Sequence, residues 1–478
     1  MHRHLMTALT LSALGALQPA LAAPAGLPTD AAELSRRLAA RFEGDRTGAC
    51  VVAAVIDRDR VLRGQACAGT RADGPPAPDA AFEIGSVSKT LTAYLVADLI
   101  QQKRWSLDDP IARHLPPGTP VPRQGERQIL VRDLLTHSAG LPALPPGMPL
   151  TDPANPYAAL TEDALLASLG QVQLARPIGS APAYSNFGMM LVSLAVARSS
   201  GGDLGAAWQE RLFKPLGMRA AIGAAAGVPQ AAGHLPGGSL TPAWTITPRL
   251  AGVGMVRASL ADMVAYARAG LGDGPADVVA RLRLTQQPLA HGYAMNWMRQ
   301  TLQGRELLMH EGGTGGFSSL LALDPARQQA VVLLADTALT DLGGLGDLGL
   351  SLLGLDVPVQ APRRQVQAPA ALRQALAGEY RLGTMPLRIW QGEDGRLMAQ
   401  AAGQSAFELQ HDSRGDFYPV GLAARLVPLP APAAGTGVPG FSWHQGGGVV
   451  SAWRVPAAGS DAAASPGAPR DWAGEFQL

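Results

Sequence analysis

The stretch FEIGSVSKT, residues 82–90, carries the strongest indication of fold in this chain. In it Ser86 and Lys89 stand three residues apart, where a short apolar segment gives way to a helical pattern over residues 90–103. On a helix this spacing places both side chains on one side, so the lysine amine reaches the serine hydroxyl. The helix start adds backbone N–H groups beside Ser86, which favours acylation of this serine.

Lysine is rare in the sequence, which contains only Lys89, Lys103 and Lys214 and otherwise uses arginine. Arginine keeps its proton, whereas a buried lysine can lose it, so a lysine beside a serine indicates a titrating role. A serine at a helix start followed by a solvated lysine is the alternative that so short a pattern leaves open.

Tyr184-Ser185-Asn186 lies between a loop rich in proline and glycine and a helical pattern over residues 187–198. In an extended segment, residues two apart point the same way, so the phenol and the carboxamide are expected to face one cavity. There the phenol would move protons, and the amide would hold a substrate carbonyl or Lys89. An ordinary helix-entry loop is the alternative.

His310-Glu311-Gly312-Gly313 ends a predicted strand. Glycines after a strand let the backbone approach a ligand, and an exposed N–H here would complete an oxyanion hole with that of Ser86. A glycine-rich hairpin turn is the alternative. A zinc-binding H-E-x-x-H helix is excluded because Thr314 stands where the second histidine is needed. We expect neither a metal nor a cofactor.

Cys50 and Cys67 flank two strand-like stretches that are separated by Arg58 and Asp59. A two-residue turn there places the cysteines opposite each other at a non-hydrogen-bonded pair, where side chains approach closely. In an oxidising compartment we expect a disulfide, with two reduced core residues as the alternative.

Residues 1–22 combine a basic start, an apolar run and a small-x-small pattern, which predicts a signal peptide cut after Ala22 or Ala23 and a periplasmic or secreted protein. No later stretch approaches the roughly 20 apolar residues of a membrane-spanning helix. The net charge is +1 without blocks of like charge, so nucleic acid is not an expected partner. We expect a small-molecule or short-peptide substrate.

The pattern of elements predicts an α+β fold. A helix at 29–43 and the cysteine hairpin come first, and three strand-like runs come late, at 306–310, 318–323 and 330–335, before a helix-like stretch at 342–355. They describe an antiparallel sheet flanked by helices, with a helical subdomain inserted and a cleft between the layers. We divide the chain into a hydrolase-type domain at 29–355, a linker at 356–370, a small β-barrel-like domain at 371–456 and a low-complexity tail at 457–478.

Together these motifs resemble the serine beta-lactamase and penicillin-binding-protein family, most closely its class C branch. Residues 82–90 look like its S-x-x-K element and Tyr184-Ser185-Asn186 like its Y-x-N element, while LLTHSAGLP at 134–142 and PLGM at 215–218 are similar to loops of this branch. The resemblance covers residues 34–355 and implies a beta-lactamase/transpeptidase-like fold.

The resemblance also implies roles. Ser86 would attack a carbonyl, Lys89 and Tyr184 would exchange the proton, and Asn186 would orient the substrate. The N–H groups of Ser86 and Gly313 would hold the oxyanion, beside Gly312, and His310 would complete the catalytic set. Water, or another acceptor activated by Tyr184, would then release the acyl group.

One departure bears on the substrate. His310-Glu311-Gly312 stands where class C beta-lactamases usually carry K-T-G, and histidine supplies weaker fixed positive charge than lysine. Glu311 would repel an anion unless it points away from the cleft, as strand alternation predicts. We therefore expect an esterase or D-peptidase. A class C-like beta-lactamase and a non-catalytic penicillin-binding or scaffold protein are the alternatives.

His137 lies in the LLTHSAGLP loop, where a structural role, holding backbone carbonyls, is expected. The same expectation covers His234 and His291. The loops at 141–156 and 223–247 are expected to form the walls of the pocket.

Overall fold

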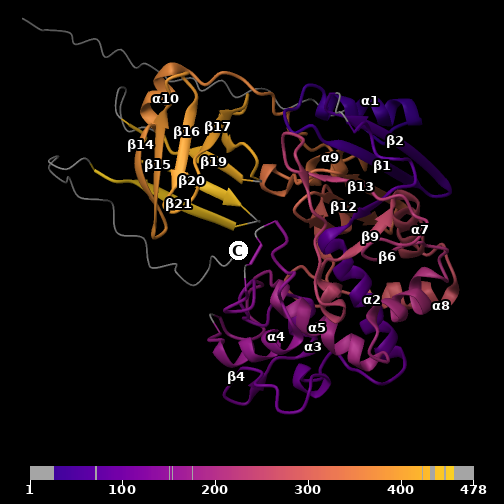
Figure 1. Cartoon of the computed structure of the whole chain (residues 1–478). Helices are drawn as coiled ribbons and strands as arrows, with labels where there is room; N and C mark the ends of the chain where they lie inside the picture. Colours follow the sequence, from indigo (N-terminus) through magenta and orange to yellow (C-terminus); the bar gives the residue numbers. More distant parts are fainter. Residues whose placement is uncertain are drawn as a thin grey trace, which may run out of the picture.

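The computed structural model describes residues 26–69, 73–149, 151–152, 154–174, 176–422, 424–430, 437–445 and 448–456. The predicted signal peptide and the low-complexity tail lie outside these ranges. Figure 1 shows an antiparallel sheet between helices, a helical region below it, and a separate barrel beside it. This confirms the predicted α+β architecture. In the described ranges, no helix has the length and apolar character that crossing a bilayer requires.

The main sheet joins strands from the beginning and the end of residues 29–355. Its strand order is β10 (Met298–Leu302), β11 (Arg305–Gly313), β12 (Ser318–Asp324), β13 (Gln329–Ala335), β1 (Cys50–Asp57) and β2 (Arg60–Cys67). All neighbours are antiparallel, and β1 lies between β2 and β13. The early hairpin and the late strands thus form one sheet, as expected, while β10 was not predicted.

α-Helices lie on both faces of this sheet, in the helical region and beside the barrel (Figure 1). Their bounds are α1 (Ala31–Phe42), α2 (Ser88–Gln101), α3 (Val131–Leu135), α4 (Glu162–Ser168), α5 (Asn186–Ser199), α6 (Leu204–Trp208), α7 (Leu260–Leu271), α8 (Ala276–Thr285), α9 (Gly346–Leu352) and α10 (Ala370–Leu376). The expected helix-like stretch at 342–355 is thus shorter, and the 3-10 turn η6 (Thr340–Leu342) precedes it.

Strand β1 is apolar at nearly every position because both of its faces are buried. Val51, Ala53 and Val55 pack in the core cluster that contains residues of α1 and α9. Val52, Ala54 and Ile56 pack in the larger cluster with α2, α5 and α7. The second cluster joins the sheet to the helical region, and the motif residues lie along that junction.

Short elements complete this domain. A small sheet pairs β9 (Val256–Ser259) with β3 (Ala81–Glu83) on one side and β6 (Ala221–Ile222) on the other. The 3-10 turns η1 (Gly85–Val87) and η5 (Pro248–Val253) flank α2. Two-stranded pairs form at β4 (Arg123–Gln124) with β5 (Arg127–Gln128), and at β7 (Gly233–His234) with β8 (Leu240–Thr241).

The two cysteines form a disulfide. Cys50 faces Cys67 across β1 and β2, with their Cα atoms 4.0 Å apart. Asp57 pairs with Arg60, so Arg58 and Asp59 form the two-residue turn from which this register was predicted. Arg58 has a φ of 55°, the left-handed conformation that such hairpin turns require.

The C-terminal part is a closed eight-stranded barrel, drawn in orange to yellow in Figure 1. Its strands are β14 (Gly378–Leu382), β15 (Met385–Gln391), β16 (Leu397–Ala401), β17 (Phe407–His411), β18 (Phe417–Pro419), β19 (Ala424–Pro428), β20 (Gly440–Gln445) and β21 (Gly448–Arg454). Tyr380, Ile389, Phe417 and Phe441 fill its interior with other apolar side chains. Closure removes exposed sheet edges.

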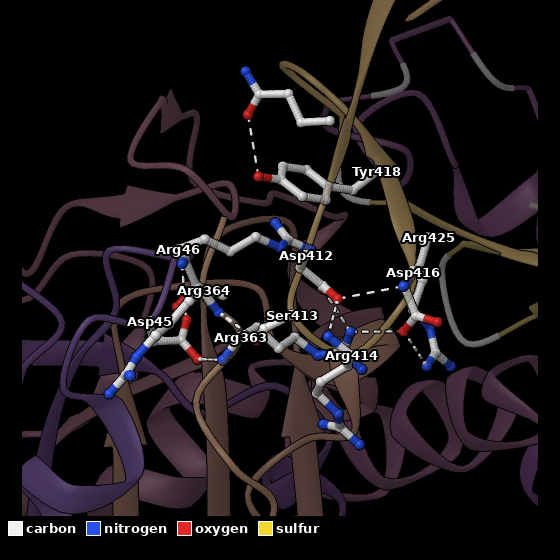
Figure 2. A network of polar contacts seen from close by, with 12 residues as sticks. Asp45, Arg46, Arg363, Arg364, Asp412, Ser413, Arg414, Asp416, Tyr418 and Arg425 are labelled. Carbon is white, nitrogen blue, oxygen red and sulfur yellow. Dashed lines mark hydrogen bonds and ion pairs between the residues drawn. The ribbon is translucent and has the colours of Figure 1, made fainter. Parts of the chain in front are cut away.

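A buried ionic network joins the barrel to the rest of the chain (Figure 2). Arg363, which is 1% exposed, donates through Nη1 to Asp412 Oδ2 at 2.8 Å and to Asp416 Oδ2 at 2.7 Å in the barrel. Its backbone N–H donates to Asp45 Oδ2 at 2.8 Å, just after α1. Arg46 Nε donates to Asp412 at 3.3 Å. The segment expected to be a linker is therefore packed between both domains at Arg363.

Candidate active site

Ser86 and Lys89 are brought together at the start of α2. Ser86 lies in η1, just ahead of α2, and Lys89 lies in the first turn of α2. The expectation that both residues lie on one α-helix is therefore corrected for Ser86. Side chains three apart eclipse in a 3-10 turn, and the predicted contact therefore forms. Lys89 Nζ donates to Ser86 Oγ at 2.7 Å.

The Lys89 side chain is fully buried. Nζ also donates to the Val253 carbonyl oxygen at 2.7 Å, and no carboxylate in the described part of the chain forms an ion pair with it. Desolvation lowers the pKa of Lys89 well below its usual value near 10.5. A neutral amine beside Ser86 is able to accept the serine proton.

Tyr184 reaches the same hydroxyl from the loop before α5. Its phenol is a hydrogen-bond partner of Ser86, and Lys89 Nζ lies 5.0 Å from the centre of its ring. Although 41% of the residue is exposed, desolvation of the phenol raises the pKa of Tyr184, and the hydrogen bond with Ser86 acts in the opposite direction. The phenol is therefore neutral at neutral pH and available as a proton donor.

His137 holds the loop that carries Tyr184. Its Nδ1 accepts the backbone N–H of Ser185 at 3.2 Å, and its own carbonyl accepts the N–H of Ala183 at 2.8 Å. The His137 and Tyr184 ring centres are 4.3 Å apart. The role is structural, as expected, but the imidazole accepts from an N–H instead of donating to a carbonyl.

His234 and His291, for which a structural role was also expected, contact carbonyl or carboxylate oxygens. His234 Nδ1 lies 3.0 Å from the carbonyl oxygen of Asp336 and its Nε2 lies 2.9 Å from Asp73 Oδ2. His291 Nε2 lies 2.9 Å from the carbonyl oxygen of Gly179. These contacts agree with the structural expectation for both.

Strand β11 brings His310, Gly312 and Gly313 beside this group. A Cβ on Gly312 would lie 2.1 Å from the carbonyl oxygen of Ile84, and a Cβ on Gly85 would lie 2.6 Å from the nitrogen of Gly313. Only glycine allows β11 and η1 to approach so closely. The backbone of Gly313 is thus placed next to that of Gly85, the residue before Ser86, which is compatible with the expected oxyanion hole.

His310 and Glu311 point to opposite faces of the sheet. The His310 ring is 2% exposed and lies 6.3 Å, centre to centre, from that of Tyr184. The Glu311 carboxylate packs against Gly344 and Gly346 on the other face, as strand alternation predicts. Burial and the nearby Asp347 raise the pKa of Glu311 to about 7. Glu311 therefore does not repel a substrate in the cleft.

Asn186 is oriented by an aromatic residue that sequence reasoning missed. Its Nδ2 donates to Tyr157 Oη at 3.3 Å, while its Oδ1 is buried without a hydrogen-bond partner in the described residues. The sequence left two roles open for this amide, namely holding Lys89 or holding a substrate carbonyl. No contact between Asn186 and Lys89 is found among the described residues. The free acceptor favours the other role, contact with a substrate.

Tyr157 and Trp244 form an aromatic pair, 5.4 Å between ring centres, beside Asn186. Thr245 and Asn155 join their loops by two hydrogen bonds of 2.8 Å. Both aromatic residues lie in or next to the loops expected as pocket walls. Their position in these loops was the only sequence signal for the two aromatic residues, because the conformation of a proline- and glycine-rich loop does not follow from periodicity.

No cluster suited to a metal ion occurs in the described ranges.

Comparison with known proteins agrees with these observations. The profile of the family described as Beta-lactamase matches residues 36–352. The chain is 27% identical over 220 residues to the D-alanyl-D-alanine-carboxypeptidase/endopeptidase AmpH of Escherichia coli K12, covering 46% of this chain and 57% of AmpH. It is 30% identical over 216 residues to the esterase EstB of Burkholderia gladioli, covering 41% and 53%. The match thus spans little more than half of each relative.

Among solved structures, that of SurE has a TM-score of 0.51 at 24% identity, and the match covers 86% of this chain and 95% of SurE. It includes the C-terminal part of this chain, which the family profile does not.

Proposed function

Since this chain belongs to the beta-lactamase family, we propose that it is a serine hydrolase that forms an acyl-enzyme on Ser86. The observation that carries the proposal is the 2.7 Å contact between Ser86 Oγ and a buried Lys89. A fully buried lysine without a carboxylate partner is costly, and such perturbed groups cluster at functional sites.

The acylation step uses both neighbours of Ser86. The neutral Lys89 amine takes the hydroxyl proton as Ser86 Oγ attacks a carbonyl carbon, and the N–H groups of Ser86 and Gly313 hold the resulting oxyanion. The bond to the leaving group then breaks, and Tyr184 supplies the proton that the leaving nitrogen or oxygen needs. The products are the acyl-serine, a lysine ammonium, a tyrosinate and the free leaving group.

Deacylation restores the starting state. The tyrosinate takes a proton from water, whose oxygen attacks the acyl carbonyl carbon, and the ammonium of Lys89 returns its proton to Ser86 Oγ as the ester bond breaks. An acceptor other than water would be activated in the same way.

The substrates we propose are esters and peptides of D-amino acids. The names of the relatives, a D-alanyl-D-alanine peptidase and an esterase, support this class. A class C-like beta-lactamase remains the second candidate because the S-x-x-K and Y-x-N elements are the same, but the neutral His310 in place of a lysine disfavours an anionic lactam. Export through the leader at residues 1–22 is also a proposal.

The test is turnover of p-nitrophenyl acyl esters, D-alanyl peptides and nitrocefin, with intact-mass detection of the acyl-enzyme. Ester or D-peptide turnover that is lost in Ser86→Ala and kept in Ser106→Ala, an exposed serine beyond the far end of α2, supports the proposal. Dominant nitrocefin turnover would favour the lactamase. Absence of any adduct on the wild-type protein would favour a non-catalytic binding protein.

A further inference from the structure

Among the described residues the His310 ring makes one hydrogen bond, and this bond decides which ring nitrogen carries a proton. Nδ1 lies 2.6 Å from the carbonyl oxygen of Glu311. A carbonyl oxygen only accepts, so Nδ1 must be the protonated nitrogen. In a neutral imidazole the other nitrogen, Nε2, then has no hydrogen and presents a lone pair.

The ring is held in this neutral form. Burial, and to a smaller extent repulsion by Lys89 whenever that amine is protonated, lowers the pKa of His310 to about 3. Burial lowers the pKa of Lys89 as well, and His137 on the neighbouring loop is likewise kept neutral. The side chains around His310 therefore do not supply a fixed positive charge at neutral pH.

No described residue uses the lone pair of Nε2. Nε2 is buried and has no hydrogen-bond partner among the described residues. The His310 ring stands at 61° to that of Tyr184, with centres 6.3 Å apart. In the proposed mechanism Tyr184 protonates the leaving atom. Because His310 is next to Tyr184, the part of the leaving group adjacent to the scissile bond would lie beside the His310 ring.

We infer that His310 Nε2 is a hydrogen-bond acceptor for the leaving group, and that the enzyme selects substrates with a neutral N–H donor there over those with a free carboxylate. The inference rests on the proposed acyl-serine function. A carboxylate offers only acceptors and would meet the lone pair of Nε2 without a bridging proton. An internal peptide or a C-terminal amide supplies the missing donor.

The test compares three forms of one ester, N-acetyl-D-alanyl-D-lactic acid, with the lactyl carboxyl as the free acid, the N-methylamide or the N,N-dimethylamide. The two amides are both neutral and differ by one methyl group and the N–H donor. The kcat/KM for release of N-acetyl-D-alanine is expected to be roughly tenfold higher for the methylamide than for the dimethylamide, the factor of one neutral hydrogen bond. The free acid should be at least as poor as the dimethylamide.

Two variants separate the acceptor from other causes. In His310→Leu the ratio of methylamide to dimethylamide kcat/KM should fall to about one, and in His310→Lys the free acid should become the best of the three. A wild-type enzyme that prefers the free acid, or a ratio that His310→Leu leaves unchanged, overturns the inference. Even if a variant does not fold, a wild-type enzyme that prefers the free acid or the dimethylamide overturns the inference.

Failure of the underlying function gives a different result. If wild-type protein forms no acyl-enzyme with a p-nitrophenyl ester, the acyl-serine proposal fails, and this inference with it. If the acyl-enzyme forms on Ser86 but the three esters do not follow the expected order, only the assignment of His310 fails.

Discussion

Lys89 Nζ lies 2.7 Å from Ser86 Oγ, and the lysine is fully buried without a carboxylate partner in the described part of the chain. Lys89→Arg places a permanent cation beside Ser86 and removes the group that can accept its proton. We expect the rate of acylation by a p-nitrophenyl ester to fall about a thousandfold, within the range of a positioned general base. Single-turnover measurement of p-nitrophenol release checks this. The matched control is Lys103→Arg, an exposed lysine after α2, which should acylate as the wild type does.

The pH dependence of kcat/KM should be a broad plateau across neutrality. Activity requires Lys89 without its proton, so the rate rises with pH through the lowered pKa of Lys89. It also requires Tyr184 with its proton, so the rate falls only above the raised pKa of that phenol. A series from pH 5 to pH 10 with a p-nitrophenyl ester measures this. Activity confined to pH values above 10 would contradict a neutral Lys89.

Gly312→Ala should separate β11 from the loop that carries Ser86. The added Cβ would lie 2.1 Å from the carbonyl oxygen of Ile84 and 2.5 Å from Ser319 Oγ, so strand or loop must move. Removing one oxyanion donor costs about 10²–10³ in kcat, and a loss of that size is expected here. Gly170→Ala, whose Cβ would make ordinary contacts at 3.6 Å, is the control. Wild-type kcat in Gly312→Ala would show that this approach is not needed.

Glu311→Gln should change how stability depends on pH. The pKa of this carboxyl is raised to about 7 by burial and by Asp347, from 4.5. The folded state therefore holds the proton more tightly, and stability is lost as pH rises from about 4.5 through 7. Glutamine removes that loss, so the variant should gain on the order of 2–3 kcal/mol over the wild type above pH 7. Urea unfolding at pH 5 and pH 8 measures it, and an equal difference at both pH values would contradict the assignment.

Arg363→Met tests the junction shown in Figure 2. The substitution leaves the buried Asp412 and Asp416 with less compensating charge, which costs about 3–5 kcal/mol for a broken buried pair. We expect earlier unfolding of the barrel and faster proteolysis within residues 356–369. Arg388→Met, which breaks an exposed pair with Glu379 on the barrel, should have little effect. Equal stability of the two variants would show that the network does not hold the domains together.

Local rules were sufficient for part of this structure. The register of the Cys50 and Cys67 hairpin followed from a two-residue turn, and the contact of Ser86 with Lys89 followed from their spacing. The burial of Arg363 could not be predicted, because its partners Asp412 and Asp416 are brought to it by barrel closure. The proline-, glutamine- and alanine-rich segment around it has the composition of a free spacer, and only tertiary contacts show otherwise.

The aromatic pair of Tyr157 and Trp244 and the orientation of Asn186 were missed for a related reason. They depend on two loops that come together only through contacts such as those of Asn155 with Thr245. The tautomer of His310 likewise depends on one backbone carbonyl, which a residue pattern cannot supply. Thus the contact between the proposed reacting groups followed from the sequence, whereas the loop contacts and the tautomer that bear on the proposed substrate did not.

The position of β1 between β2 and β13 also has a consequence for biosynthesis. Cys50 in β1 bonds to Asp336, 286 residues later, so the sheet has a high contact order and cannot close until most of the chain exists. Until then the apolar strand CVVAAVI keeps one edge without a partner, which is the kind of segment that promotes aggregation. The nascent chain is therefore most prone to aggregation through this strand in the interval before residues 329–335 are made.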